Sequence, residues 1–300
     1  TRRICESLCA TDLLGFQTIG DVRCFLDTVG EFVPGAAVDR NDHTVDLKGH
    51  TTSVKVYPIS INVEEVQRIA NTPRALDYET KLAEDTGEVT IVRIDRAEPN
   101  KNIVRGFRAY ELLLTRYPEL KGKVKFLAFL VPSRTHIRQY QRYMDEIQQV
   151  IQQINNNHGT DDWQPIVPFI ENNYTQAIAG MKLYDVLLVN TIIEGMNLVA
   201  KEGPVVNNRD GVLVLSHSSG VYKQLADGAL TIAILGYPSD AEPHHVARSE
   251  RAGVSAEHGE FAFAWTGQSR GEMGERRLAI ARDADDAEGF AGPNVEIDPR

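Results

Sequence analysis

Residues 88–134 read EVTIVRIDRAEPNKNIVRGFRAYELLLTRYPELKGKVKFLAFLVPSR and contain one complete strand–helix–strand unit. The apolar, β-branched run at 88–95 predicts a strand, and the run at 124–131 predicts a second one. Between them, the Pro-Asn pair at 99–100 opens a helix that continues to Tyr117, with apolar residues three and four positions apart. Two strands connected by one helix in this way lie parallel in one sheet.

The same alternation of strands and helices continues to residue 232. Further strands are predicted at 164–170, 185–190, 211–216 and 229–232. Further helices are predicted at 136–157 and 174–183, and two more open near Gly195 and Ser219. Six strands with five intervening helices indicate an α/β fold with a doubly wound, Rossmann-like sheet.

The segments on either side of this sheet domain, 88–232, have different patterns. Residues 1–70 carry a strand, a helix and a β-hairpin turning near Lys48, so we interpret them as the remnant of a separate domain. The polar segment 71–87 is interpreted as a hinge or helix-containing linker. In 233–300 only eight residues are Ile, Leu or Val, so we expect low order after about residue 236. This tail is either a poorly ordered extension or the product of a shifted reading frame, and the abrupt change favours the second.

Composition excludes several classes of protein. With 42% hydrophobic residues, the 300-residue chain can bury a sizeable core, which excludes disorder of the whole chain. The net charge of -10 argues against a nucleic-acid partner, because such proteins present a broad basic face. The apolar runs are shorter than the roughly 20 residues that span a bilayer, and no signal segment opens the chain. We therefore expect a cytoplasmic protein with no membrane partner.

The three cysteines, Cys5, Cys9 and Cys24, all lie in the first tenth of the chain. None has a partner at zinc-ligand spacing, and buried thiols on a helix are favoured over a redox function. The chain begins at Thr1, inside an expected helix, so we interpret it as a fragment that lacks an upstream portion.

Basic residues follow the first two strands of the sheet domain. Arg96 and Lys101 come after the first strand, and Arg134 comes after the second. Because the carboxyl ends of parallel strands meet at one edge of a sheet, these cations suit a polyanion such as a diphosphate. Taken alone, Arg96 and Lys101 fit a solvated surface pair better than a diphosphate site.

The segment TIIEGMNLVAKE, residues 191–202, follows the fourth strand. Gly195 lets the backbone approach a ligand, and the amides of the helix expected to open there suit an anion. Glu202 is placed to accept hydrogen bonds from hydroxyls such as those of a sugar. In the alternative interpretation, Glu194 caps the helix and Glu202 is solvated.

Common cofactor and nucleophile motifs are absent from the sequence. It contains no GxGxxG, no GxxxxGK[ST] and no GxSxG, and its histidines do not form a metal-ligand set. We therefore expect no cofactor and no catalytic metal.

Several strings together resemble the trehalose-6-phosphate synthases of glycosyltransferase family 20. In chain order they are DLLGFQT (12–18), YPISI (57–61), RAEPNKN (96–102), RGFRAYELLL (105–114), VPSR (131–134), EGMNLVAKE (194–202) and GVLVLS (211–216). The resemblance covers about residues 1–232. It implies a GT-B fold, in which two Rossmann-like domains face each other across a cleft. The sheet domain would then hold the nucleotide sugar, and residues 1–70 would be the end of the acceptor domain.

The resemblance also implies a function: a retaining transfer of glucose from a nucleotide-glucose donor to glucose 6-phosphate, giving trehalose 6-phosphate without a metal. Arg96 and Lys101 would neutralise the donor diphosphate as it leaves, and Arg134 would hold the acceptor phosphate. The family's donor-binding roles correspond here to Glu194, to the amides of Gly195, Met196, Asn197 and Leu198, and to Glu202 at the ribose hydroxyls. Front-face attack, in which the departing phosphate oxygen takes the acceptor proton, requires no pair of catalytic carboxylates.

Two departures from the family keep alternatives open. Glu194 stands where the family usually has Asp, and the family's upstream segment would precede Thr1, so we expect the fragment to bind nucleotide better than it catalyses. The alternatives are a glucosylglycerol-phosphate synthase, a pseudo-glycosyltransferase and a non-catalytic nucleotide-sugar-binding module. The sequence leaves open the oligomeric state and whether the donor is UDP-, GDP- or ADP-glucose.

Overall fold

The first sixty residues form a small α/β unit with its own core. In the computed structural model, which describes residues 1–232, 262–266 and 277–281, a four-stranded sheet has the order β1-β4-β3-β2. Its elements are α1 (Arg2–Leu8), β1 (Leu13–Phe16), α2 (Ile19–Phe32), β2 (Ala36–Asp39), β3 (Thr44–Leu47) and β4 (His50–Val56). The predicted hairpin is confirmed as β3 and β4, whereas the short strand β2 was not predicted. Cys5 and Cys9 are buried in this core, as expected, and Cys24 is exposed.

The start of α2 shows why the chain turns where it does. Thr18 accepts a hydrogen bond from the Asp21 amide, and the Asp21 carboxylate accepts one from the Thr18 amide in return. This capping box satisfies amide groups that a helix start otherwise leaves unpaired.

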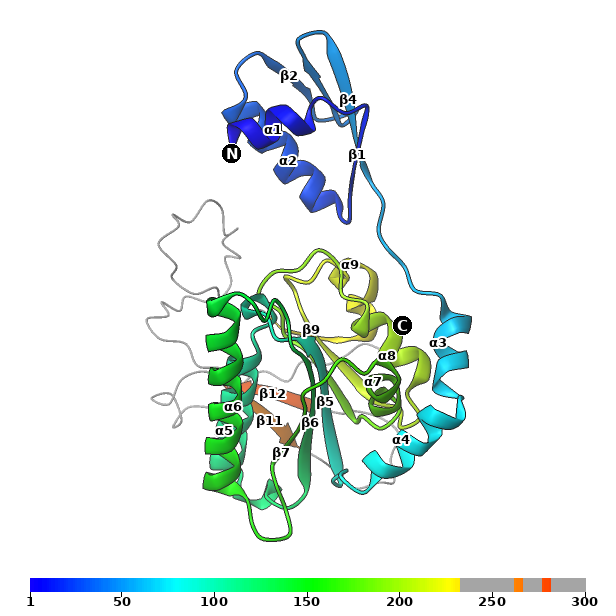
Figure 1. Cartoon of the computed structure of the whole chain (residues 1–300), viewed down its shortest axis with the longest axis vertical. Coiled ribbons are helices and arrows are strands. Elements are labelled where there is room, and N and C mark those ends of the chain that lie inside the picture. Colours follow the sequence, from blue (N-terminus) through cyan, green and yellow to red (C-terminus); the bar gives the residue numbers. More distant parts are fainter. Residues whose placement is uncertain (233–261, 267–276, 282–300) are drawn as a thin grey trace.

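Two helices follow the small unit, α3 (Val63–Ala70) and α4 (Pro73–Ala83). Val66, Ala70 and Leu82 are buried in the same apolar cluster as the helices and strands of the larger sheet. Their packing differs from the predicted division, which placed 63–70 in the first unit and 71–87 in a hinge or helix-containing linker; α4 is a helix within that range. The extended connection is instead the short segment 57–62, seen in Figure 1 between β4 and α3.

The larger unit contains a parallel sheet of six strands. These are β5 (Val89–Arg96), β6 (Val124–Val131), β7 (Ile166–Phe169), β8 (Val186–Val189), β9 (Val212–Ser216) and β10 (Leu230–Ile232). Their order is β10-β9-β8-β5-β6-β7, which confirms the doubly wound sheet predicted from the sequence. The direction of winding reverses between β5 and β8, and in open α/β sheets such a switch point is where ligands bind.

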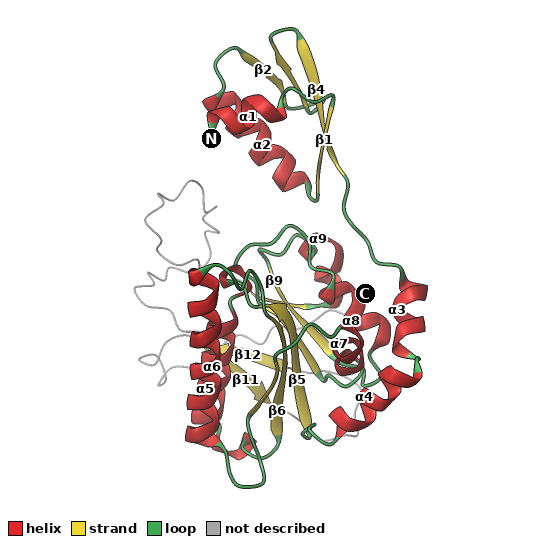
Figure 2. Ribbon diagram, viewed as in Figure 1, coloured by secondary structure: helices red, strands yellow, loops and turns green. Residues whose placement is uncertain are grey.

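Helices cover both faces of this sheet, which is why its strands are almost continuously apolar (Figures 1 and 2). One face carries α5 (Ile103–Arg116) and α6 (Arg138–His158). The other carries α7 (Tyr174–Met181) and α8 (Val199–Val206), with α3 and α4 packed against them. The short elements α9 (Tyr222–Leu225), η1 (Pro99–Lys101), η2 (Pro118–Leu120) and η3 (Ala226–Gly228) complete the unit.

Beyond residue 232 the structure describes one antiparallel pair of strands, β11 (Ala262–Thr266) and β12 (Arg277–Ala281), which the sequence did not predict. The other residues of the expected low-order tail lie outside the described residues.

The close approach of α7 to the sheet yields a first prediction. A Cβ atom on Gly180 would lie 2.4 Å from the ring of Phe129, which is buried and stacked on Phe169. We expect Gly180→Ala to lower the free energy of unfolding by about 1–3 kcal/mol, because the ring has no room to withdraw. Urea unfolding followed by circular dichroism measures this change.

The matched control is Gly30→Ala on α2, where the new Cβ would meet its nearest atom at 3.5 Å. There the higher helix propensity of alanine should stabilise the protein by up to about 1 kcal/mol. Equal effects of the two substitutions would contradict the packing described for α7.

Candidate functional site

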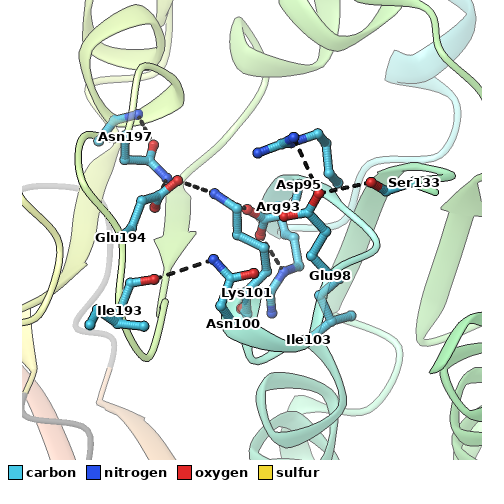
Figure 3. Close-up of polar contacts among 12 residues, drawn as sticks. Arg93, Asp95, Glu98, Asn100, Lys101, Ile103, Ser133, Ile193, Glu194 and Asn197 are labelled. Atoms are coloured by element: carbon cyan, nitrogen blue, oxygen red, sulfur yellow. Dashed lines mark hydrogen bonds and ion pairs between the residues drawn. The ribbon is translucent and has the colours of Figure 1, made fainter. Parts of the chain in front are cut away.

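Lys101 lies at the switch point between β5 and β8, at the end of η1. Its side chain is buried, and its ammonium group forms ion pairs with Glu194 and, at 3.6 Å, with Asp95 Oδ1 (Figure 3). Arg96 is the last residue of β5 rather than a loop residue, and its side chain is 60% exposed. The structure therefore places the two predicted cations at one edge of the sheet, one buried and one facing solvent.

Arg93, which the sequence analysis missed, fixes the position of Lys101. It is fully buried, its Nε donates to Asp95 Oδ2 at 2.9 Å, and its Nη2 donates to the Lys101 carbonyl at 2.5 Å. Burial raises the pKa of the Asp95 carboxyl, and the Arg93 and Lys101 charges oppose that rise. The available signal was an arginine inside an otherwise apolar strand, where a charge needs a partner.

Two loops meet at this point, and we call residues 97–102 the β5 loop and residues 190–198 the β8 loop. Asn102, at a left-handed φ of 58°, donates from Nδ2 to the Asn190 carbonyl at 3.1 Å, and Asn190 Nδ2 donates back to the Asn102 carbonyl. Asn100 accepts from the Ile192 amide and donates to the Ile193 carbonyl. Together with the Lys101–Glu194 pair, these bonds make the two loops one unit; Figure 3 shows the Asn100–Ile193 and Lys101–Glu194 contacts.

The β8 loop differs from its predicted form, because α8 begins at Val199 and not near Gly195. Glu194 does not cap the helix: its Oε1 pairs with Lys101 and its Oε2 accepts from Asn197 Nδ2 at 2.9 Å. Asn197 Oδ1 accepts from the Ala200 amide and so performs the capping itself. Glu202 consequently lies in the first turn of α8, not two turns along it.

The four backbone amides predicted to bind the donor lie in this loop, ahead of the helix. Within the described part of the chain, the amide groups of Gly195, Met196, Asn197 and Leu198 donate no hydrogen bond. Gly220, after β9, contacts the β8 loop, and its amide donates to the Glu194 carbonyl at 3.1 Å. A Cβ on Gly220 would lie 1.5 Å from the Gly195 carbonyl oxygen, so only glycine permits this approach. Unpaired backbone amides of this kind are suited to bind an anion.

Glu202 is buried, and the hydroxyl of Tyr174 donates to its Oε1 at 2.9 Å. Burial raises the pKa of the Glu202 carboxyl, and the hydrogen bond from Tyr174 opposes that rise. Burial also raises the pKa of the Tyr174 hydroxyl, which keeps it protonated as a donor. The sequence analysis did not identify Tyr174, because its contact with Glu202 joins positions 28 residues apart.

Lys201, beside Glu202, binds the connection between the two units. Its Nζ donates to the Ile59 carbonyl at 2.8 Å, while the Ile59 amide donates to Gln17 Oε1 at 2.7 Å. Burial lowers the pKa of Lys201. The helix that carries Glu202 is thus tied to the segment that follows the small unit.

Arg134 lies on the loop after β6, with a positive φ of 45°. Its Nη1 donates to the Tyr140 hydroxyl at 2.8 Å, and its guanidinium lies 5.1 Å from the centre of the Tyr140 ring. Its neighbour Ser133 donates to Glu98 Oε1 at 2.8 Å, and Arg96 Nη1 pairs with the same oxygen at 3.2 Å. Glu98 therefore connects the β5 loop to the loop that carries Arg134.

The arrangement combines an exposed cation, a buried cation and unpaired amides at the carboxyl ends of β5 and β8. Chemically, it can neutralise an anion and accept hydrogen bonds from hydroxyls at Glu202. No group of three or more potential metal ligands lies among the residues that the structure describes. None of the helices in that part of the chain is long and apolar enough to cross a membrane.

Comparisons with known proteins match this chain to one family. The family profile described as "Glycosyltransferase family 20" matches residues 1–236. A trehalose-6-phosphate synthase of Klebsiella pneumoniae is 32% identical over 246 residues, which cover 79% of this chain and 49% of that protein. The chain thus spans about half the length of this relative.

Solved structures show the same likeness. A UDP-forming α,α-trehalose-phosphate synthase from Burkholderia xenovorans, in complex with glucose-6-phosphate, has a TM-score of 0.70 and 30% identity, covering 77% of this chain and 52% of that one. A structure from E. coli bound with UDP-2-fluoro glucose has a TM-score of 0.69 and 29% identity, covering 77% and 51%. The neighbours are trehalose-phosphate synthases, whose GT-B fold was expected from the sequence.

The buried ion pairs yield a second prediction. Asp95→Asn removes the carboxylate between Arg93 and Lys101, and we expect a loss of about 3–5 kcal/mol in the free energy of unfolding, because a charge is left buried without its partner. The control is Asp77→Asn, which breaks the exposed pair with Lys81. Urea unfolding should show almost no change for the control. Similar losses of unfolding free energy in both variants would contradict the claim that the buried ion pairs of Asp95 stabilise the fold more than an exposed pair does.

The raised pKa of Glu202 yields a third prediction. The folded protein keeps this proton at pH values where the unfolded chain has lost it, so wild-type stability should fall as pH rises from 4.5 through the raised pKa. Glu202→Gln has no such titration. The free energy of unfolding of the variant relative to wild type should therefore increase between pH 4 and pH 7 (about the range in which carboxyls titrate). A difference that stays constant, or decreases, would show that Glu202 is not held in this environment.

Proposed function

The chain belongs to glycosyltransferase family 20, and we propose that it supplies the donor-binding side of an enzyme that transfers glucose from a nucleotide-glucose to glucose 6-phosphate, giving trehalose 6-phosphate. The similar E. coli structure holds UDP-2-fluoro glucose and the similar Burkholderia structure holds glucose-6-phosphate, which supports both substrate classes. Both substrates carry phosphate charges that oppose passage through a membrane, so the proposal includes a cytoplasmic location.

One observation carries the proposal: two cations and a run of unpaired backbone amides both lie at the switch point of the sheet. Arg96 and Lys101 lie on the β5 loop side. The amides of residues 195–198, which donate no hydrogen bond to any described residue, lie on the β8 loop side. The negative charge of a diphosphate would be neutralised by the two cations, and its oxygens would accept hydrogen bonds from the backbone amides. Glu202, in the first turn of the following helix, is the acceptor proposed for the ribose hydroxyls.

In the proposed reaction, the bond between the anomeric carbon and the diphosphate oxygen breaks, and a bond to the acceptor hydroxyl oxygen forms on the same face. The departing phosphate oxygen takes the acceptor proton. Negative charge grows on the diphosphate as the bond breaks, so Arg96 and Lys101 stabilise the transition state more than the bound donor. This preference is what accelerates a reaction.

Glu194 and Arg134 complete the proposal. Glu194 would turn from Lys101 to the hydroxyls of the transferred glucose, and Arg134 would bind the acceptor phosphate. Glu194 has one methylene more than the aspartate usual in the family, and this longer side chain would help its carboxylate move from Lys101 to the glucose hydroxyls. The same difference favours a relative with another acceptor as the second candidate.

Calorimetric titration with UDP, GDP and ADP tests the proposal and gives the fourth prediction. One nucleotide should bind with micromolar affinity, and Arg96→Ala should weaken it about 10- to 100-fold, because a charge-assisted hydrogen bond is lost. Arg40→Ala is the matched control, since Arg40 is also 60% exposed and also forms one ion pair, with Asp27. Binding that is equally strong in the two variants, or absent for all three nucleotides, would refute the proposed site.

A further inference from the structure

We infer that Tyr174 forms a wall of the nucleotide pocket, where its hydroxyl orients Glu202 and its exposed ring contacts the nucleobase. The inference rests on the proposed function, because it takes Glu202 as the ribose-binding carboxylate. It adds a residue that contacts the nucleobase. The residues proposed for the diphosphate, the glucose and the ribose have no contact assigned to the base.

Tyr174 is at the correct edge of the sheet. It is the first residue of α7 and follows β7, so it lies at the carboxyl ends of the strands with the β5 and β8 loops. The helices α7 and α8 are in contact, and the hydroxyl of Tyr174 reaches Glu202 Oε1 at 2.9 Å. Glu202 is only 8% exposed, whereas Tyr174 is 46% exposed.

The ring is exposed and yet held in place. At its backbone end, Tyr174 follows Asn173, whose side chain is fixed on both sides. Asn173 Oδ1 accepts from the Gln176 amide and caps α7, and Asn173 Nδ2 donates to the Tyr78 hydroxyl at 2.9 Å. Its hydroxyl end is held by Glu202, so both ends of the side chain are fixed. A large aromatic surface fixed in solvent is typical of a binding wall, because little conformational entropy remains to be lost when a ligand covers it.

The chemistry of a nucleotide places its base beside this ring. The base is attached to the ribose carbon next to the one that bears the 2′-hydroxyl, so hydroxyls bound at Glu202 leave the base within reach of Tyr174. One carboxylate oxygen of Glu202 accepts from Tyr174, and the other is available to a ribose hydroxyl. Stacking on an aromatic ring tolerates every base, because every base has a π-face. Tyr174 therefore strengthens nucleotide binding without selecting among bases.

The experiment compares two probes, UDP and inorganic pyrophosphate, by calorimetry on the whole chain. Tyr174→Leu should weaken UDP about 5- to 150-fold, the range measured for stacking of one base on an aromatic side chain. Pyrophosphate, which has neither ribose nor base, should bind the variant as it binds wild type. Tyr174→Phe keeps the ring, so it should lose less UDP affinity than Tyr174→Leu and serves as the second variant if the leucine protein is unstable.

Phe32→Leu is the matched control, because Phe32 on α2 is also 46% exposed and lies in the small unit. It should leave the binding of both probes unchanged. Unchanged UDP affinity in Tyr174→Leu, or an equal loss for both probes, would overturn this inference while leaving the proposed function in place if Arg96→Ala still weakens UDP. Failure of wild type to bind UDP, GDP and ADP would overturn the proposed function itself, and if GDP or ADP binds in place of UDP, that nucleotide is the probe for the Tyr174 variants.

Discussion

The chain of buried ion pairs from Arg93 through Asp95 and Lys101 to Glu194 connects two loops whose members lie 93 positions apart in the sequence. Burying each of these charges costs several kcal/mol, and that cost is offset only when the charges pair closely and their remaining hydrogen bonds are made. Two cations and two anions give the cluster no net charge. The requirement to keep these partners together fixes the β5 loop against the β8 loop, and the contacts proposed for the diphosphate depend on that arrangement.

The packing around the cluster follows from the same requirement. A Cβ on Gly106 would lie 2.5 Å from Arg93 Nη1, so the first turns of α5 can pass the buried guanidinium only because that position is glycine. Gly220 allows a still closer approach of the chain after β9 to the β8 loop, because a Cβ there would lie 1.5 Å from the Gly195 carbonyl oxygen. The reciprocal bonds of Asn102 and Asn190 then satisfy backbone carbonyls that water cannot reach. A rigid frame made in this way is what a site needs if its cations are to meet charge that develops during a reaction.

The sequence predicted the regular parts of this molecule well and the contacts of the site only in part. Strand and helix periodicity sufficed for the six parallel strands, because local hydrophobic pattern and long-range packing agree there. It failed where tertiary contacts decide: α3 joined the larger unit because Val66 and Ala70 found their partners there, and α8 began late because Glu194 bonds to Lys101 instead of capping the helix. Arg93 and Tyr174 escaped prediction for a similar reason, since their roles come from partners that only the fold brings close. The roles given to Arg96, Arg134 and Glu202 remain proposals.

Lys101 and Arg96 differ in what they can offer an anion. Lys101 already faces two carboxylates, and one of them, Asp95, is held by Arg93 and cannot withdraw. In the proposed complex, a diphosphate at Lys101 would replace Glu194, so the electrostatic gain there would be only the difference between the two anions. Arg96 is 60% exposed, and within residues 1–232 its one carboxylate partner, Glu98, is shared with the Ser133 hydroxyl. Its charge is less fully neutralised, so in the proposed complex most of the electrostatic gain on binding would come from Arg96. Lys101, with Glu194 turned toward the sugar, would fix where the diphosphate lies and add a smaller share of the charge stabilisation.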